Sequence, residues 1–187
     1  DSDFRIFGFE NMNTKSVDIF QKLETQYASY VSRKTLEKTL MANFVKFKEN
    51  NKGSGGGWHR DSLNRRQVKF MVYLSDVNDD NGPFQYLKGS HVFSSKFRTN
   101  GAGYKKVRYT QDEISKYSRS WPLVNCIGKK GSCVVFDSSG LHRGSPLKHG
   151  NRYAITQYMF DSTMPKHISQ MILKDKVIKD SHTRMNK

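Results

Sequence analysis

The chain has 187 residues, a hydrophobic fraction of 35% and a formal net charge of +15 at pH 7. This length suits one domain with a sizeable core. No run of residues approaches the ~20 apolar residues that a transmembrane helix needs. Twelve phenylalanines and nine tyrosines favour a core built from large rings, which is typical of β structure.

The positive charge predicts attraction to anions such as nucleic acid, acidic glycans, phosphorylated metabolites or an anionic surface. Lysine and arginine total 32 against 17 aspartates and glutamates, with dense groups at 104–108 and in the C-terminal tail. No RNA-binding signature or zinc-finger spacing accompanies these groups, so nucleic acid is not the favoured partner.

Two helices are expected near the start of the chain. The first begins at Ser16, a suitable N-cap residue, and carries apolar residues at helical spacing as far as Tyr30. The second covers residues 32–40, "SRKTLEKTL". Neither helix offers catalytic side chains, so we expect both to serve packing.

Alternation of apolar and polar residues then predicts a series of strands. "NFVKFK" (43–48) ends at a glycine-rich loop, which we interpret as a mobile lip of a cleft. In "RQVKFMVYLSDV" (66–77), Lys69, Met71 and Tyr73 share one face. That face combines polar and large groups, as expected for a strand that lines a wet cleft. "FQYLKGSH" (84–91) follows an Asn-Gly turn and is another short strand.

The second half of the chain predicts more β structure. Residues 93–120 are irregular and basic, with a short helix indicated by the capping box from Thr110 to Glu113. "LVNCI" (123–127) and "SCVVFD" (132–137) flank the turn "GKKG" and are expected to form a hairpin. "NRYAITQYMF" (151–160) is the last clear strand. Many short strands joined by Gly-rich turns predict a mainly β sandwich or barrel with flanking helices.

We expect a single domain spanning residues 1–187. It comprises a helical N-terminal part (14–40), a β core (about 43–160) and a basic C-terminal tail (161–187). Cys126 and Cys133 are the only cysteines and could face each other across the expected hairpin. Two cysteines do not make a disulfide framework, so small buried thiols and a reducing, cytoplasmic location are favoured. The sequence does not indicate an oligomeric state.

His59, Asp61 and His142 are the candidate metal ligands. On an extended backbone His59 and Asp61, two positions apart, point to the same side. His142 follows the apolar strand "CVVF" and so also lies at a strand end. Two imidazoles and one carboxylate form a facial set that suits Fe(II) and leaves three coordination positions open. The alternative is that these are surface or turn residues without a joint role.

Arg152 strengthens the case for a joint role. It begins a strand on which Ala154, Thr156 and Tyr158 share its face. A guanidinium there can hold a carboxylate through two parallel hydrogen bonds. The alternative is an ordinary salt bridge, with Asp137 as the candidate partner.

Four ordered blocks, "GWHRDS", "NGPFQYLKGSH", "LHRGSP" and "RYAITQY", resemble the Fe(II)/2-oxoglutarate-dependent dioxygenases, and among them the phytanoyl-CoA dioxygenase-like family. The resemblance covers roughly residues 43–160 and implies a double-stranded β-helix, the cupin-like jelly roll. It implies that His59, Asp61 and His142 bind Fe(II) and that Arg152 holds the C5 carboxylate of 2-oxoglutarate. It further implies a reaction that uses O2 and releases succinate and CO2.

The resemblance also bears on neighbouring positions. It places Met71 against the cosubstrate, and Lys69 and Tyr73 on the same face are further candidates for contact with cosubstrate or substrate. Family members often have Ser or Thr two positions after the distal histidine, where this chain has Gly144, followed by Ser145. A second contact to the 2-oxoglutarate carboxylate is therefore not assigned. Arg60 is expected to point away from the metal, towards substrate or water.

The expected function is hydroxylation of a small or anionic substrate, such as a metabolite, lipid or glycan. Halogenases of this type lack the carboxylate ligand, so Asp61 favours hydroxylation over halogenation. "YKKVRY" (104–109) is a candidate for recognising an anionic group. Desaturation, epimerisation and cyclisation remain open as outcomes. A further alternative is a non-catalytic jelly-roll module that binds an acidic polymer or nucleic acid, against which the intact ligand set argues.

Overall fold

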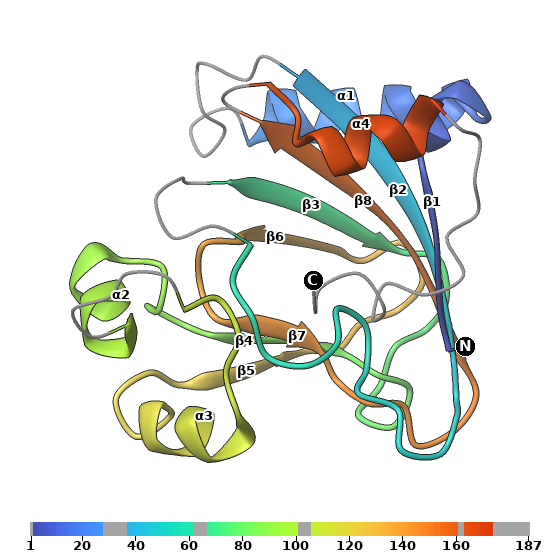
Figure 1. The fold of residues 1–187 in the computed structure, drawn as a ribbon. Helices are drawn as coiled ribbons and strands as arrows, with labels where there is room; N and C mark the ends of the chain where they lie inside the picture. The colour runs from blue at the N-terminus through green and yellow to red at the C-terminus, as the bar shows by residue number, and fades with distance from the viewer. Residues whose placement is uncertain (1, 28–36, 62–66, 101–105, 161–162, 174–187) are drawn as a thin grey trace.

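The structure is a computed structural model that describes residues 2–27, 37–61, 67–100, 106–160 and 163–173. Its named strands form two antiparallel sheets that face each other (Figure 1). The larger sheet has the order β1 (Asp3–Phe7), β2 (Glu37–Lys46), β8 (Asn151–Phe160), β3 (Val68–Tyr73), β6 (Cys133–Asp137). The smaller sheet has the order β5 (Leu123–Cys126), β4 (Phe84–Leu87), β7 (His142–Gly144). The predicted jelly-roll class, mainly β with flanking helices, is confirmed.

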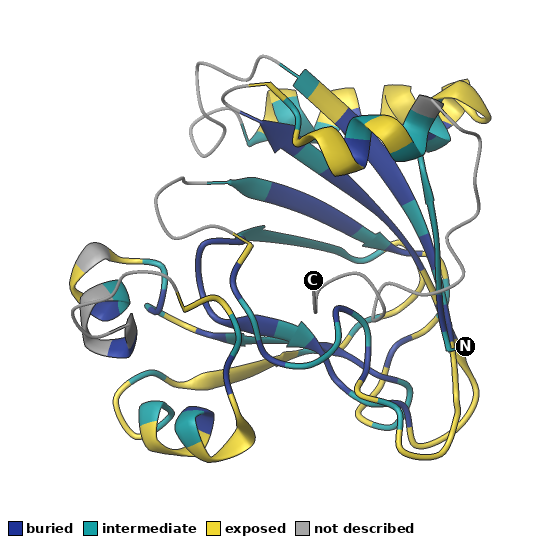
Figure 2. Ribbon diagram, viewed as in Figure 1, coloured by how far each residue is buried: buried dark blue, intermediate teal, exposed yellow. Residues whose placement is uncertain are grey.

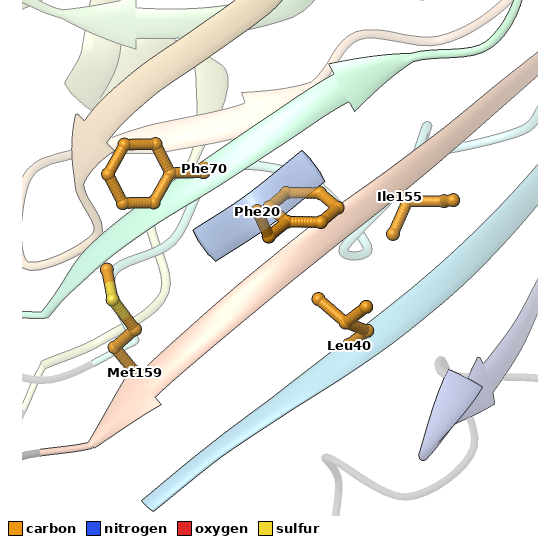
Figure 3. Close-up of a cluster of buried hydrophobic side chains, with 5 residues drawn as sticks. All are labelled: Phe20, Leu40, Phe70, Ile155 and Met159. Carbon is orange, nitrogen blue, oxygen red and sulfur yellow. The ribbon is translucent and has the colours of Figure 1, made fainter. Parts of the chain in front are cut away.

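Two helices cover the outer face of the larger sheet, α1 (Thr14–Gln26) and α4 (Lys166–Leu173) (Figure 1). The short 3-10 helix η1 (Phe9–Asn11) leads from β1 into α1. Phe20 of α1 packs there against apolar side chains of three strands (Figure 3), namely Leu40, Phe70, Ile155 and Met159. None of the helices in the described residues is long and apolar enough to cross a membrane.

The inner face of the larger sheet forms a second core with the smaller sheet. Met71 and Tyr73 of β3 lie there with Phe84 and Ala154, whereas Phe70 lies on the outer face. This alternation confirms the two faces predicted for the strand at 66–77. Figure 2 shows the resulting pattern, in which β2, β3 and β8 are largely buried and the outward sides of α1 and α4 are exposed. The candidate site lies between this inner face and the smaller sheet.

Helix α3 (Gln111–Tyr117) packs beside the smaller sheet, and α2 (Phe93–Asn100) lies at one end of the molecule (Figure 1). Ile114 of α3 shares a buried cluster with Trp58, Leu87, Tyr109 and Leu141. The capping box predicted at its start is present: the Thr110 hydroxyl accepts the Glu113 backbone N–H, and the Glu113 carboxylate accepts that of Thr110. Helices α2 and α4 and strand β1 were not predicted from the sequence.

The two predicted N-terminal helices need correction. Helix α1 begins at Thr14 rather than at Ser16, because Asn13 is the N-cap and its side chain accepts the backbone N–H of Ser16. The predicted second helix is wrong at residues 37–40, which begin β2 and pair with the end of β8. A full ladder along β8 overrides the helical propensity of this segment. Residues 28–36 lie outside the described part of the chain.

The predicted hairpin at 123–137 is also wrong. Strand β5 pairs with β4 in the smaller sheet, and β6 pairs with β3 in the larger sheet. The turn between them therefore carries the chain from one sheet to the other. Cys126 and Cys133 do not face each other across a ladder, and both are free thiols of intermediate burial.

Candidate active site

A short β-bridge places the two histidines side by side. The backbone N–H of His59 donates to the carbonyl of His142 over 2.9 Å, and the reciprocal bond has the same length. Side chains of directly paired residues project from the same face, and the two imidazole centroids are 4.3 Å apart. The bridge thus joins the segment before β3 to β7 and brings together two residues that are distant in sequence.

Backbone carbonyls determine which nitrogen of each ring carries the proton. Nδ1 of His59 lies 2.8 Å from the Gly57 carbonyl, and Nδ1 of His142 lies 2.9 Å from the Gly140 carbonyl. A carbonyl oxygen only accepts, so each Nδ1 donates and each Nε2 keeps its lone pair. Burial lowers the pKa of both imidazoles, that of His59 to about 3, although Asp61 partly opposes the effect. Both rings are therefore neutral, as metal ligands must be.

Asp61, two residues after His59 in the same segment, is the third candidate metal ligand. Its backbone N–H donates to the Ser138 carbonyl over 3.0 Å. Its two carboxylate oxygens lie 3.6 Å and 3.9 Å from Nε2 of His59 and His142, respectively. Burial alone would raise the pKa of Asp61, but Lys69 and the two imidazoles hold it well below its usual range. The carboxylate is therefore ionised.

The three side chains converge closely enough to share one ion. One ligand atom from each of His59, Asp61 and His142 lies within 4.8 Å of the others, and the described residues contain no second such group of histidine, cysteine or acidic side chains. Two neutral imidazole nitrogens and one carboxylate match the donor set that suits Fe(II). The donor chemistry therefore fits the predicted metal.

Arg152 lies on the inner face at the start of β8 and is only 2% exposed. It donates to the Gly82 carbonyl and, over 3.3 Å, to the side-chain oxygen of Asn43, while its Nε has no partner among the described residues. The alternative salt bridge to Asp137 is not found; that carboxylate accepts the backbone N–H groups of Gln67 and Ser139. Burial lowers the pKa of Arg152. Because a buried cation without a counter-charge is costly, the site suits an anionic ligand.

The remaining predicted residues, Lys69, Met71 and Tyr73, all lie buried on the inner face of β3. The Lys69 ammonium is 2.5 Å from Asp61 and 3.6 Å from the centroid of the Tyr158 ring. The Tyr73 hydroxyl donates to the Cys126 carbonyl and accepts the backbone N–H of Phe84. Their contacts with a cosubstrate stay predictions.

Comparison with known proteins agrees with this geometry. The family model described as phytanoyl-CoA dioxygenase (PhyH) matches residues 9–150. The chain belongs to this family. Its membership and the His-Asp-His donor set together support the predicted cofactors Fe(II), 2-oxoglutarate and O2. Among curated proteins, no significant match is found.

Solved structures share the fold of this PhyH-family chain at low identity. EvdMO1 superposes with a TM-score of 0.60 at 18% identity, over 85% of this chain and 36% of its own. SnoN, an α-ketoglutarate-dependent epimerase from nogalamycin biosynthesis, gives 0.56 at 18%, over 89% and 66%. EctD from S. alaskensis with bound Fe gives 0.53 at 16%, over 83% and 56%. The chain thus spans about a third to two thirds of these proteins.

The position of Arg60 in this PhyH-family site differs from the sequence-based prediction. Its side chain points away from the metal ligands as expected, but it contacts neither substrate space nor water, since it is only 2% exposed. Its guanidinium donates to the carbonyls of Ser90 and Ser139 over 2.8 Å each and to the Thr99 hydroxyl over 2.8 Å. Arg60 therefore ties helix α2 and the turns at Ser90 and Ser139 to the segment that carries His59 and Asp61.

The sequence analysis missed a polar chain beside Arg152. Asn43 accepts from Arg152 and donates to Asp3 over 2.5 Å, and Asp3 forms an ion pair of 2.8 Å with Arg5. Asp3 is 1% exposed. Alternation within "NFVKFK" could have placed Asn43 on the inner face, but no sequence signal identified strand β1 at the start of the chain.

Proposed function

We propose that the chain is an Fe(II)- and 2-oxoglutarate-dependent oxygenase that hydroxylates an unactivated C–H bond of a small or anionic substrate. The observation that carries the proposal is the pairing of two features that the two facing sheets supply, the metal-type donors from the side of β7 and Arg152 from β8. Three metal-type donors converge within 4.8 Å, and Arg152 is buried with an unpartnered Nε. A ligand with one metal-chelating end and one carboxylate end satisfies both features.

In this proposal each residue has a defined task. His59, Asp61 and His142 hold Fe(II), and the carbonyls behind the two rings keep Nε2 directed at the metal. Arg152 binds the distal carboxylate of 2-oxoglutarate, for which its planar guanidinium is suited. When bound, Fe(II) and 2-oxoglutarate supply the oxidation, in which O2 is consumed and succinate and CO2 are released. Met71 lies on the same face and excludes water from the cosubstrate.

The charges around the site favour an anionic substrate. Arg108 is the backbone bridge partner of His59 on the side opposite His142, so its side chain projects from the same face. Four cations and two carboxylates belong to this region, namely Arg5, Lys69, Arg108, Arg152, Asp3 and Asp61. This positive excess attracts anions. The adjoining Lys105 lies outside the described residues.

The test is turnover of 2-oxoglutarate in the absence of an identified substrate. Purified protein is loaded with Fe(II) under argon, mixed with 2-oxoglutarate and O2, and assayed for succinate. We expect slow succinate formation by the wild type, none by His142→Ala, and wild-type behaviour by His149→Ala. His149 is the matched control because it is exposed and its nearest acidic partner is Asp80, away from the triad.

Three outcomes separate the candidate functions. Absence of iron binding and of succinate in the folded wild type would overturn the proposal and favour a non-catalytic binding module. Succinate formation that survives His142→Ala would overturn the ligand assignment. With a substrate in hand, mass spectrometry distinguishes hydroxylation, which adds one oxygen atom, from desaturation, epimerisation or cyclisation, which leave no added oxygen.

A further inference from the structure

Gly144 has no side chain at a crowded point next to Arg152. A Cβ atom built on Gly144 would lie 2.7 Å from Cβ of Ser54 and 3.2 Å from Nη1 of Arg152. Ser54 therefore fills the space that a side chain at position 144 would occupy. The Ser54 side chain and the Arg152 guanidinium face the same small volume.

The glycine-rich loop is pressed against β7, and this contact holds Ser54 in place. Gly53 has a φ of +74°, and a Cβ there would lie 2.1 Å from the Gly144 carbonyl oxygen, so only glycine permits the approach. The Gly144 N–H donates to the Ser54 carbonyl over 3.0 Å. The loop and β7 are thus joined at Gly144, two residues after the metal ligand His142.

Arg5 fixes the orientation of the Ser54 hydroxyl. Its Nη2 donates to Oγ of Ser54 over 3.2 Å and to Asp3 over 2.8 Å. Oγ is therefore the acceptor in this bond, and its own hydrogen is left to donate. Within the described residues the Ser54 hydroxyl makes no hydrogen bond as a donor, and Nε of Arg152 has no partner. Two neighbouring side chains thus each keep a donor available for a ligand.

We propose that Ser54 donates a hydrogen bond to the C5 carboxylate of 2-oxoglutarate alongside Arg152. Gly144 has no side chain that could supply this hydroxyl. Ser54, from the loop before His59, occupies that space and supplies it instead. Arg5 is the positioning residue that orients this hydroxyl. The inference rests on the proposed function, since it assigns a second contact in the same cosubstrate site.

Ser145 is the competing source of a hydroxyl, because it directly follows Gly144. It is buried, and its Oγ lies 3.5 Å from the Pro146 carbonyl. Neighbouring residues of an extended segment point to opposite sides. Ser145 therefore faces away from the space that Ser54 and Arg152 share, and it provides a matched control.

The experiment measures the affinity of Fe(II)-loaded protein for 2-oxoglutarate by anaerobic calorimetry. A hydrogen bond to a charged group contributes enough that Ser54→Ala should weaken binding about 10- to 100-fold, whereas Ser145→Ala should bind as the wild type does. Gly144→Ser should also weaken binding, because the new side chain meets Ser54. The exchange S54G/G144S removes the shortest of these contacts, that with Cβ of Ser54, and returns a hydroxyl to the same space, so affinity should recover relative to Gly144→Ser.

A second ligand separates loss of this contact from general damage. 2-Oxopentanoate has a methyl group in place of the C5 carboxylate, so Ser54→Ala should not weaken its binding further. Equal affinities of Ser54→Ala and wild type for 2-oxoglutarate would overturn the inference, as would equal losses for both ligands. A folded wild type that binds no 2-oxoglutarate would instead overturn the proposed function itself.

Discussion

Arg60 and Arg152 are equally buried, at 2% exposure each, yet replacement by methionine should cost far more stability at Arg60 than at Arg152. Arg60 uses all three nitrogens: besides the bonds to Ser90, Ser139 and Thr99, its Nε donates to the Tyr109 hydroxyl over 3.3 Å. Arg60→Met leaves two buried carbonyls without this donor, at about 1–3 kcal/mol each. With the other lost bonds, we expect the free energy of unfolding to fall by about 3–5 kcal/mol.

Arg152→Met loses two hydrogen bonds, against the four that Arg60 makes, and it removes a buried cation whose Nε has no partner among the described residues. These effects oppose each other, so we expect a stability cost of only about 0–2 kcal/mol. The stabilisation by bound 2-oxoglutarate should distinguish Arg152→Met from the wild type more clearly. At a concentration of 100 times its Kd, 2-oxoglutarate stabilises a protein that binds it by about 2.7 kcal/mol. That stabilisation should be present in the Fe(II)-loaded wild type and absent from Arg152→Met.

Equilibrium urea unfolding, followed by tryptophan fluorescence under argon with Fe(II), measures both quantities. Each variant is unfolded with and without 2-oxoglutarate. The reasoning fails if Arg152→Met is destabilised as much as Arg60→Met, or if it keeps the stabilisation by 2-oxoglutarate. A cost below about 1 kcal/mol for Arg60→Met would show that its buried bonds contribute little.

Gly55→Ala should reduce Fe(II) affinity at least tenfold in an anaerobic titration, because its Cβ would lie 2.5 Å from the His59 ring. Gly131→Ala is the control, since Gly131 has a similar positive φ but lies in open space. It should cost about 1–3 kcal/mol of stability and leave metal affinity unchanged. Lys69→Met should weaken 2-oxoglutarate binding about tenfold by making the site one charge less positive, and a parallel loss of Fe(II) affinity would contradict this reading. Burial raises the pKa of Cys133 to about 11, so its thiolate is scarce at pH 8 and its alkylation in the folded protein should be much slower than in urea, as peptide mapping would report.

The local pattern of the sequence predicted those parts of the fold in which neighbouring residues determine the structure. Strand β8 has the predicted bounds, and β3 has the predicted faces. The helix expected at 32–40 and the hairpin expected at 123–137 failed for one reason. Both segments take their conformation from a strand far away in the sequence, β8 for the first, and β4 and β3 for the second. Pairing over that range leaves no trace in local periodicity.

The same distinction applies to the site. His59, Asp61 and His142 could be predicted because their spacing within ordered blocks carries the pattern, and the structure brings their side chains together. Asp3 and Arg5 could not, because β1 reaches the site only by joining the edge of the larger sheet beside β2. Arg60 showed the limit of alternation: its direction was predicted correctly, but its burial depends on distant parts of the chain, namely helix α2 and the turns at residues 90 and 139.

The glycines before His59 serve close packing rather than the mobility that the sequence suggested. Four of them, at positions 53, 55, 56 and 57, have positive φ, which turns their carbonyls and N–H groups towards the site at low cost. Several of those groups are used: the Gly57 carbonyl holds the ring of His59, the Gly55 and Gly56 carbonyls accept from Arg108, and the Gly55 N–H donates to Asp3. Opening this loop would break these bonds, including the one that holds the ring of His59. We therefore expect the loop to act as a fixed wall that presents Ser54 to the cosubstrate, with access to the site from another side.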